Sequence, residues 1–351
     1  MNEVDNDTDR VALMQQAMAG ESTPRLPIWL MRQAGRTDPA YNRLKAESGL
    51  PLESLFRHPQ LAAEISLLPR RLNIDAIIFF QDILTPLEPM GANFIFDPAP
   101  RLEIPRNTPA AIEQLSEFDV AKQMPYVGET LDIIHDQLAG ALPVLGFAGA
   151  PFTLALFILE GKSAASDASF ALNFIKQHPQ ISHRLLEKLC HITIDYLRYQ
   201  ASKGVVAVQL FESCAMLPDR ELYLEFALPY QQQIFRALKN QVKSIHFARG
   251  LDDLTLLDQA DADIISLPAE ISIRQAREVL GEGRIFQGNL DNQLLANGSI
   301  AEIKSMAAKI VKSGDFKGHI FNLSHGLLRE TPYQNIVELV SSVQSMRPNT
   351  G

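Results

Sequence analysis

Two arginines stand four residues apart in the segment MRQAGR, residues 31–36. A planar guanidinium group can bind a carboxylate or a phosphate through two parallel hydrogen bonds. Gly35 stands between the two arginines and lets the backbone turn closely. The spacing of Arg32 and Arg36 therefore indicates a fork for an acidic ligand, although two arginines on a solvated surface would have the same spacing.

Asp82 is the second candidate, because apolar residues flank it at 79–80 and 83–84. A carboxylate in apolar surroundings has to be paired or hydrogen-bonded, since leaving it bare costs several kcal/mol. We expect Asp82 to face a ligand, and a structural ion pair with a neighbouring arginine is the alternative.

Ser213 and His325 also follow apolar runs, in the segments FESC (211–214) and FNLSHG (321–326). Ser213 lacks the glycine-flanked turn of a nucleophilic serine, so we expect it to hydrogen-bond a ligand. His325 could bind an anion, act as an acid or base, or ligate a metal, and a structural histidine of the core is the alternative. Ala248 stands two residues after His246, so the His-x-Cys spacing of a zinc thiolate site is absent.

Short apolar runs with the character of buried parallel strands alternate with longer segments of helical spacing. The predicted strands are residues 27–31, 75–80, 143–147, 205–211, 244–248, 263–267, 284–288 and 319–323. Eight strands, each followed by a helix, predict an α/β protein with a (β/α)₈ TIM barrel; a doubly wound sheet more often has a glycine-rich first turn. Barrel enzymes carry their chemistry at the carboxyl ends of the strands, where all the candidates above stand.

The connection between the second and third predicted strands is long, but no linker marks a second domain. Residues 85–141 between the second and third predicted strands form an insertion with extra helices and a hairpin near 93–102. A strong apolar stripe predicts a long helix over 179–202. We expect residues 1–20 to be a flexible or helical N-terminal segment and residues 21–347 to be a single barrel domain.

The composition narrows the class of partner. Lys and Arg number 32 against 41 Asp and Glu, a net charge of −9, so no global field draws in nucleic acid or an anionic membrane. No apolar run reaches the ~20 residues of a membrane helix, and the first ten residues are acidic, so we expect a cytoplasmic protein. Two cysteines are too few for a disulfide framework or a thiolate zinc cage.

Several of these segments together resemble the uroporphyrinogen decarboxylases of haem biosynthesis. They are PIWLMRQAGR (27–36), the run that ends at Asp82, GFAGAPFTLA (146–155), QLFES (209–213), QGNLD (287–291) and HIFNLSHGLLRETP (319–332). The resemblance runs in order from about Arg25 to Val343. It implies a single distorted barrel, a homodimer with facing clefts, and decarboxylation of uroporphyrinogen III to coproporphyrinogen III without a cofactor or a metal.

The resemblance also assigns roles to residues. Arg32 and Arg36 match the arginines that engage substrate carboxylates, and Asp82 matches the aspartate that accepts hydrogen bonds from the pyrrole N–H groups. Ser213 and His325 match polar residues that position the acidic side chains. The backbone of Gln33, Ala34 and Gly35 lines the same cleft.

The chain departs from the family pattern at several positions of the pocket. Phe157 stands where the family has a tyrosine and therefore lacks a hydroxyl group. The other departures are Thr37, Gln81, the run 214–216, Pro268 and Ser324. They leave open a divergent paralogue that binds a tetrapyrrole without decarboxylating it. A zinc- and cobalamin-related methyltransferase on the same fold is a second, less favoured alternative, because Ala248 and the lack of a cysteine after residue 214 remove the expected zinc ligands.

Overall fold

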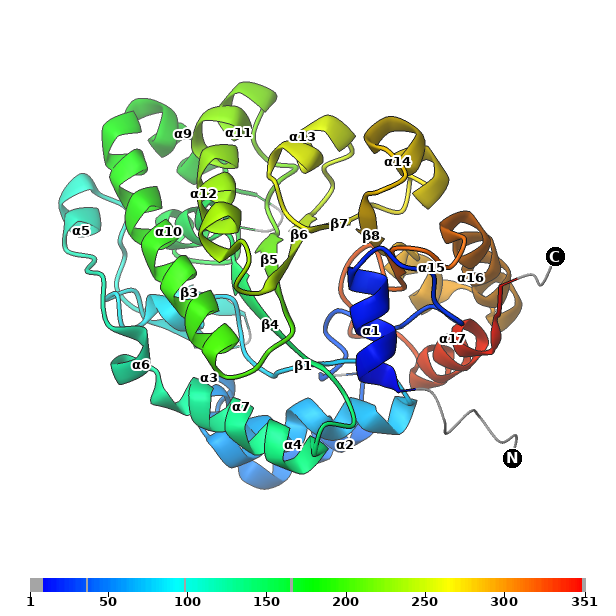
Figure 1. Ribbon diagram of the computed structural model, residues 1–351. Helices are drawn as coiled ribbons and strands as arrows, with labels where there is room; N and C mark the ends of the chain where they lie inside the picture. The colour runs from blue at the N-terminus through cyan, green and yellow to red at the C-terminus, as the bar shows by residue number, and fades with distance from the viewer. Residues whose placement is uncertain (1–8, 36, 98, 165–166, 349–351) are drawn as a thin grey trace.

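A curled parallel sheet forms the centre of the protein, and helices surround it (Figure 1). The structure, a computed structural model, describes residues 9–35, 37–97, 99–164 and 167–348. The sheet has the order β1-β4-β5-β6-β7-β8-β9, and every neighbouring pair is parallel. Its strands are β1 Ile77–Ile78, β4 Val144–Gly149, β5 Ala207–Glu212, β6 Lys243–Ala248, β7 Ile264–Ser266, β8 Ile285–Gln287 and β9 His319–Ile320.

Residues 27–29 close this sheet into a barrel. Ile28 forms a parallel bridge with Phe321, and the Phe321 N–H donates to Pro27 O at 2.8 Å. On the other side the Asp75 N–H donates to Ile28 O at 2.8 Å. The segment therefore lies between β9 and the start of β1, and the predicted (β/α)₈ barrel is confirmed.

The closing segment differs from the prediction because it is a bridge and not a strand. Pro27 has no N–H to give to a ladder. The Leu30 N–H donates to Gln33 Oε1 at 3.1 Å, and the Met31 N–H donates to Asn322 Oδ1 at 3.0 Å. Side chains thus take the place of the hydrogen bonds that a longer strand would make.

A buried ion pair ties the start of this segment to β1. Arg25 donates to both carboxylate oxygens of Asp75 at 2.7 Å, and the Ile28 N–H donates to the same carboxylate at 2.9 Å. Both side chains are almost fully buried, and Arg10 lies 3.7 Å from the same carboxylate. The Asp75 charge is therefore neutralised and hydrogen-bonded, as a buried charge has to be.

Helices follow the strands in the predicted alternation, and the helix predicted over 179–202 is confirmed as α10. Before β4 the helices are α1 Arg10–Met18, α2 Pro39–Ser48, α3 Leu52–Phe56, α4 Pro59–Leu67, η1 Leu68–Leu72, η2 Thr85–Leu87, α5 Pro109–Glu113, α6 Val120–Gln123 and α7 Pro125–Leu138. After β4 they are α8 Pro151–Glu160, α9 Ser169–Gln177, α10 Pro179–Ser202, α11 Arg220–Phe226, α12 Leu228–Leu238, α13 Leu254–Gln259, α14 Ile273–Leu280, α15 Asn292–Asn297, α16 Ile300–Gly314 and α17 Tyr333–Ser345.

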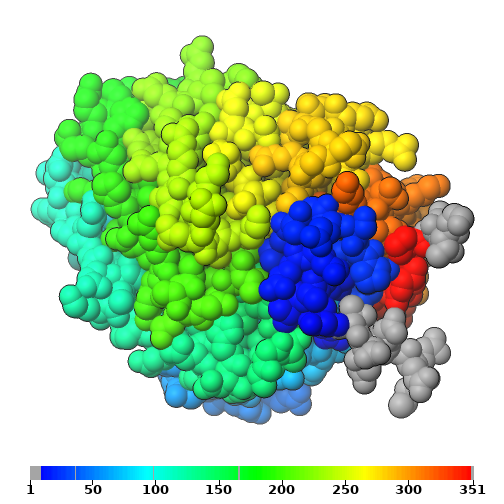
Figure 2. Space-filling view, in the orientation of Figure 1, coloured from blue at the N-terminus to red at the C-terminus, as the bar shows by residue number. Residues whose placement is uncertain are grey.

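The insertion after β1 contains the predicted hairpin and extra helices. Strands β2 Phe94–Phe96 and β3 Pro100–Leu102 pair in antiparallel register, and α5 to α7 follow. At the N-terminus, α1 packs buried side chains into the main core, and Figure 2 shows it beside the C-terminal helix. None of the helices in the described part of the chain is long and apolar enough to cross a membrane. The division at residue 20 stays a prediction.

Polar side chains cross the barrel interior in a connected chain of hydrogen bonds. Trp29 Nε1 donates to Gln287 Oε1 at 3.1 Å, and Gln287 Nε2 donates to Gln209 Oε1 at 2.8 Å. All three side chains are fully buried. Because each amide is paired, these polar groups join strands on opposite sides of the barrel without leaving a buried donor bare.

The buried Arg25–Asp75 ion pair, at the seam where the closing segment meets β1, yields a stability prediction. Replacement of Arg25 by leucine leaves the Asp75 carboxylate buried without its main partner, so Arg25→Leu should lower the free energy of unfolding by about 3–5 kcal/mol. Urea unfolding followed by circular dichroism measures this. The control is Lys304→Ala, which breaks a half-exposed pair with Glu338 and should cost about 1 kcal/mol or less. A similar loss in both variants would contradict a special role for the seam.

Candidate active site

The carboxyl ends of the strands bring the predicted residues to one end of the barrel, which we call the barrel mouth. Asp82 follows β1, Ser213 follows β5 and His325 follows β9. Arg32 follows the closing segment, between the ends of β9 and β1. The prediction that these residues lie at the carboxyl-terminal face therefore agrees with the order of the elements.

Arg32 lies among charged groups of both signs. Its φ of 63° is in the left-handed region, which non-glycine residues seldom adopt. Partial burial lowers the pKa of its guanidinium group, the negative charge of Asp82 raises it, and the positive charges of Arg249 and Arg329 lower it further. Arg32 is thus close enough to Asp82 and to two other arginines for their charges to act on it.

Asp82 stands in a tight turn that is held at both ends. The Leu84 N–H donates to Asp82 Oδ1 at 2.9 Å, and the Asp82 N–H donates to Thr85 Oγ1 at 3.3 Å. Loss of hydration raises the pKa of the Asp82 carboxyl, while the Leu84 N–H and the Arg32 charge lower it. The charged form of Asp82 therefore depends on Arg32 and on further hydrogen-bond donors.

His325 is an uncharged hydrogen-bond donor at neutral pH. Burial, together with the positive charges of Arg32 and Arg249, lowers its pKa to about 4. The Gly326 N–H donates to His325 Nδ1 at 2.7 Å, so in the neutral ring the hydrogen is on Nε2. His325 can accordingly offer an N–H to a carboxylate without carrying charge itself.

Aromatic rings line the inside of the barrel next to these polar groups, in a row that ends at His325. The rings of Phe79, Phe147, Phe211, Phe247 and His325 follow one another with centroid distances of 5.3, 5.7, 5.4 and 5.8 Å. Phe211 lies two residues after Gln209 and on the same face of its strand, which is the barrel interior. This arrangement, the aromatic collar, provides an apolar floor beneath a polar rim.

A buried carboxyl group holds the turn that carries Ser213. Thr153 donates to Glu212 through a short hydrogen bond, Gln231 Nε2 donates to the same carboxylate at 3.2 Å, and the Cys214 N–H donates to Thr153 Oγ1 at 3.2 Å. Burial raises the pKa of Glu212 to about 7. The network lies behind Ser213, outside the aromatic collar, and fixes the backbone on both sides of that serine.

The remaining predicted residues occupy different places. Phe157 is 6% exposed and packs against Phe94 at 6.5 Å between ring centroids. The Gln33 side chain is buried and donates to Ala76 O at 3.1 Å, so only its backbone is left for a ligand. Ala34 and Gly35 are partly exposed beside it, and Arg36 lies outside the described residues.

Two arginines at the barrel mouth were missed in the sequence. Arg249 directly follows β6, and its charge lowers the pKa of both Arg32 and His325. Arg329 lies in the segment 319–332, and its charge also acts on Arg32. The sequence did contain a signal for both: Arg249 is a charged residue at the end of a predicted strand, and Arg329 stands within one of the segments that resemble the family.

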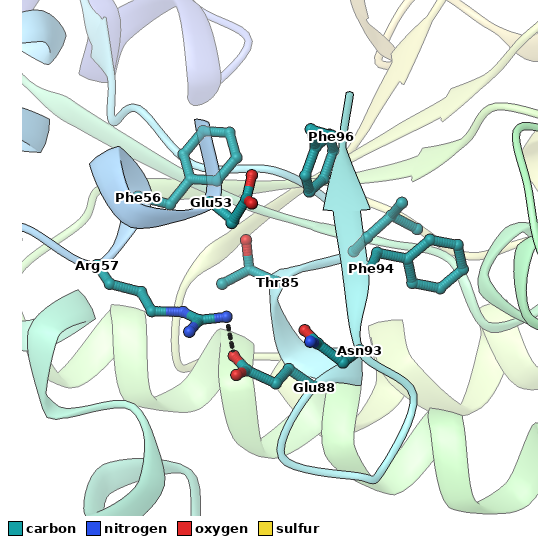
Figure 3. A pocket seen from close by; sticks show the side chains of 9 residues that line it. Glu53, Phe56, Arg57, Thr85, Glu88, Asn93, Phe94 and Phe96 are labelled. Atoms are coloured by element: carbon teal, nitrogen blue, oxygen red, sulfur yellow. Dashed lines mark ion pairs between the residues drawn. The ribbon is translucent and has the colours of Figure 1, made fainter. Parts of the chain in front are cut away.

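A small pocket borders the site but is too small for a large ligand. It is lined by Glu53, Phe56, Arg57, Leu84, Thr85, Glu88, Asn93, Phe94 and Phe96. Its interior of about 20 Å³ has room for roughly one water molecule. Figure 3 shows the Arg57–Glu88 ion pair at one side of this pocket and the phenylalanine rings at its other sides. Among the described residues, no three His, Cys, Asp or Glu side chains gather as a metal site.

The low pKa of His325 yields a test of this electrostatic arrangement. In Arg249→Gln one nearby positive charge is lost, so the His325 pKa should rise from about 4 by roughly 0.5 to 1 unit. Titration of ¹³C-labelled histidine by NMR measures it. The control is Arg236→Gln, which alters an exposed arginine on α12 and should leave the midpoint unchanged. An unchanged midpoint in Arg249→Gln would show that Arg249 does not act on His325.

Comparisons with solved structures agree on the fold. A methyltransferase from Methanosarcina mazei superposes with a TM-score of 0.79 at 17% identity, over 96% of this chain and 98% of that one. A B12-independent methionine synthase from Shewanella sp. W3-18-1 superposes with a TM-score of 0.54 at 13% identity, over 93% and 95% of the two chains. At these identities the likeness shows a shared fold alone.

Sequence comparisons are more specific. The profile of the uroporphyrinogen decarboxylase family matches residues 10–346. The uroporphyrinogen decarboxylase of Syntrophotalea carbinolica is 37% identical over 334 residues, which cover 94% of this chain and 96% of that protein. That of Carboxydothermus hydrogenoformans is 37% identical over 339 residues, with the same coverage. The chain belongs to the uroporphyrinogen decarboxylase family.

Proposed function

We propose that the protein decarboxylates the four acetate side chains of uroporphyrinogen III and gives coproporphyrinogen III and CO₂. The observation that carries this proposal is the barrel mouth, where Asp82 and Arg32 stand together above the aromatic collar. Such a site suits a ligand with an apolar macrocycle, N–H donors at its centre and carboxylates at its edge. The names of the relatives support the same reaction.

The substrate itself can accept the electron pair that decarboxylation releases. Protonation of a pyrrole carbon next to the acetate-bearing carbon gives an iminium-like ring. As the bond to CO₂ breaks, its electrons enter that ring and leave an exocyclic methylene group. Protonation of the methylene carbon gives the methyl group, and loss of the first proton restores the pyrrole. The protein then has to stabilise a cation and to orient carboxylates, which is an electrostatic task.

Asp82 is placed to stabilise that cation. Its carboxylate would accept hydrogen bonds from the pyrrole N–H groups, and its negative charge favours the protonated ring. Loss of hydration raises the Asp82 pKa, and the pyrrole donors would counter this, because hydrogen bonds to a carboxylate favour its charged form. Substrate binding and ionisation of Asp82 therefore support each other.

The positive groups would hold the acetate and propionate carboxylates. Arg32 and Arg36 are the principal candidates, and Arg249 adds a third guanidinium group near Arg32. His325 would add a neutral N–H from Nε2. An arginine is a poor acid at neutral pH because its guanidinium group stays protonated there, and a His325 with a pKa of about 4 holds no extra proton at that pH. Water at the barrel mouth is the remaining proton source, unless a bound carboxylate raises the His325 pKa.

Loss of the Asp82 charge tests the proposed role directly. Asp82→Asn keeps the size of the side chain but cannot offset a cationic ring, so kcat should fall by about 10²- to 10³-fold with the fold intact. The measurement is CO₂ release and product chromatography with uroporphyrinogen III under reducing conditions. Asp132→Asn, at a surface ion pair with Lys203, is the control and should keep normal turnover. Near-normal turnover in Asp82→Asn would contradict the role assigned to Asp82.

A homodimer is the second part of the proposal. Phe170, Met216 and Leu224 are large apolar side chains that are 48%, 37% and 38% exposed. They lie on α9, after β5 and on α11, and the Lys176–Asp219 ion pair joins these elements. Met216 and α11 follow the carboxyl end of β5, so these apolar side chains lie toward the barrel mouth, which suits a dimer whose mouths face each other.

Sedimentation velocity tests the dimer. The protein should sediment at twice the chain mass, and Leu224→Asp should shift it toward the monomer because a buried unpaired charge would cost several kcal/mol. Val279→Asp, at a residue 61% exposed on α14, is the control and should leave the mass unchanged. A monomeric protein would contradict the proposal.

A cytoplasmic location completes the proposal. Both cysteines, Cys190 and Cys214, are free and buried. Free thiols without a disulfide fit a reducing compartment.

A further inference from the structure

The segment after β9 is hydrogen-bonded to Met31, the residue that precedes Arg32. The Leu327 N–H donates to Met31 O at 3.0 Å, and the Asn322 side chain accepts from the Met31 N–H. Both backbone groups of the residue before Arg32 are thus bonded to the segment 322–327. This double attachment supports the left-handed backbone of Arg32, which costs free energy unless its surroundings hold it.

Gly326 leaves the space that the Arg32 side chain fills. A Cβ atom at residue 326 would lie 2.6 Å from Arg32 Cδ, 2.8 Å from Cγ and 3.0 Å from Nε. Real side chains do not approach so closely, so any residue other than glycine would displace the arginine stem. Gly326 also has no positive φ, so the lack of a side chain, and not backbone freedom, is what the position requires.

The same glycine acts on His325 and is itself anchored. Its N–H donates to His325 Nδ1, which leaves the ring hydrogen on Nε2. Its carbonyl accepts from Asn292 Nδ2 at 2.9 Å, and the Asn292 side chain on α15 is buried at 8% exposure. In the described part of the chain, the side-chain hydrogen bond of Asn292 goes to this carbonyl and not to a residue assigned above to the substrate.

We propose that Gly326, held by Asn292, is a positioning residue that sets both the path of the Arg32 side chain and the tautomer of His325. The inference deepens the proposed function, on which its catalytic consequence rests. A misplacement of about 1 Å at a catalytic group can cost about 100-fold in rate. Gly326 and Asn292 therefore act on the reaction through their neighbours and not by touching the substrate.

The first experiment compares two asparagines. Asn292→Ala removes the bond to Gly326 and should lower kcat/KM for uroporphyrinogen III by about tenfold. Asn335→Ala is the matched control, because Asn335 is 9% exposed and donates to Leu295 O at the same 2.9 Å. It should stay within about twofold of the wild type. Equal effects of both variants would overturn the proposal.

The second experiment reads the two neighbours separately. Gly326→Ala should lower kcat/KM by about 10- to 100-fold, and in an Arg32→Ala background the same change should cost less than about twofold, because the arginine stem is gone. ¹⁵N-histidine NMR should show Nε2 protonated in His325 of the wild type and a mixture of tautomers in Asn292→Ala. A folded Gly326→Ala with wild-type kcat/KM would overturn the inference, and so would an unchanged tautomer in Asn292→Ala.

Stability separates this inference from the proposed reaction. If the wild-type protein releases no CO₂ from uroporphyrinogen, the proposed function fails, and the cycle of Gly326→Ala and Arg32→Ala is then measured on urea unfolding. Gly326→Ala should destabilise the protein more when Arg32 is present. Equal losses of stability in both backgrounds would overturn the positioning role. If Gly326→Ala does not fold, the histidine spectra of Asn292→Ala and Asn335→Ala serve as the test, and an unchanged His325 tautomer in Asn292→Ala would overturn the inference.

Discussion

The barrel is closed by a segment that cannot pair as an ordinary strand, and the position of Arg32 depends on that closure. Parallel strands close a barrel through ladders of backbone hydrogen bonds. Here Pro27 offers no N–H, and the Trp29 N–H donates to Phe321 O at 3.3 Å. The N–H groups of residues 28, 30 and 31 donate to the side chains of Asp75, Gln33 and Asn322. Arg25 neutralises the Asp75 carboxylate, so this charged side chain can serve as an acceptor for a backbone N–H in the buried interior. A segment held by side chains ends in a fixed place, and the turn that carries Arg32 begins there.

The charges at the barrel mouth oppose the charge of the whole chain. The protein carries −9 overall. Burial nevertheless lowers the pKa of Arg32, and the nearby positive charges of Arg249 and Arg329 lower it further. Such repulsion is a cost in the absence of a ligand and is relieved by bound carboxylates. The site thus favours a polyanion locally, although the chain as a whole has no field to attract one.

Much of this arrangement follows from periodicity, and the exceptions share a physical cause. The helix over 179–202 and the hairpin near 93–102 were predicted because their apolar spacing and turn residues act locally. The bridge at residues 27–29 and the buried side chain of Gln33 were not, because the Ile28 N–H donates to Asp75 and the Gln33 amide donates to Ala76, partners 47 and 43 positions away. The role of Arg249 was missed for a similar reason, since one arginine at a strand end gains meaning only from its neighbours in space. The ring of Phe157 packs against the ring of Phe94. The sequence did not predict this contact, because the two residues are far apart in the chain.

Hydrogen bonding separates the polar groups that build the barrel from those that we propose face the substrate. Arg25, Gln287 and Glu212 are buried and have their hydrogen-bonding groups paired within the protein. Within the described residues, Asp82 accepts only the Leu84 N–H, and the Nε2 hydrogen of His325 has no acceptor. Desolvation without full pairing shifts their pKa values in opposite directions, up for the acid and down for the base. Both groups are consequently poised to gain more from a ligand that offers N–H donors and carboxylates together than from water, and this is the pair of features that a porphyrinogen with acidic side chains combines.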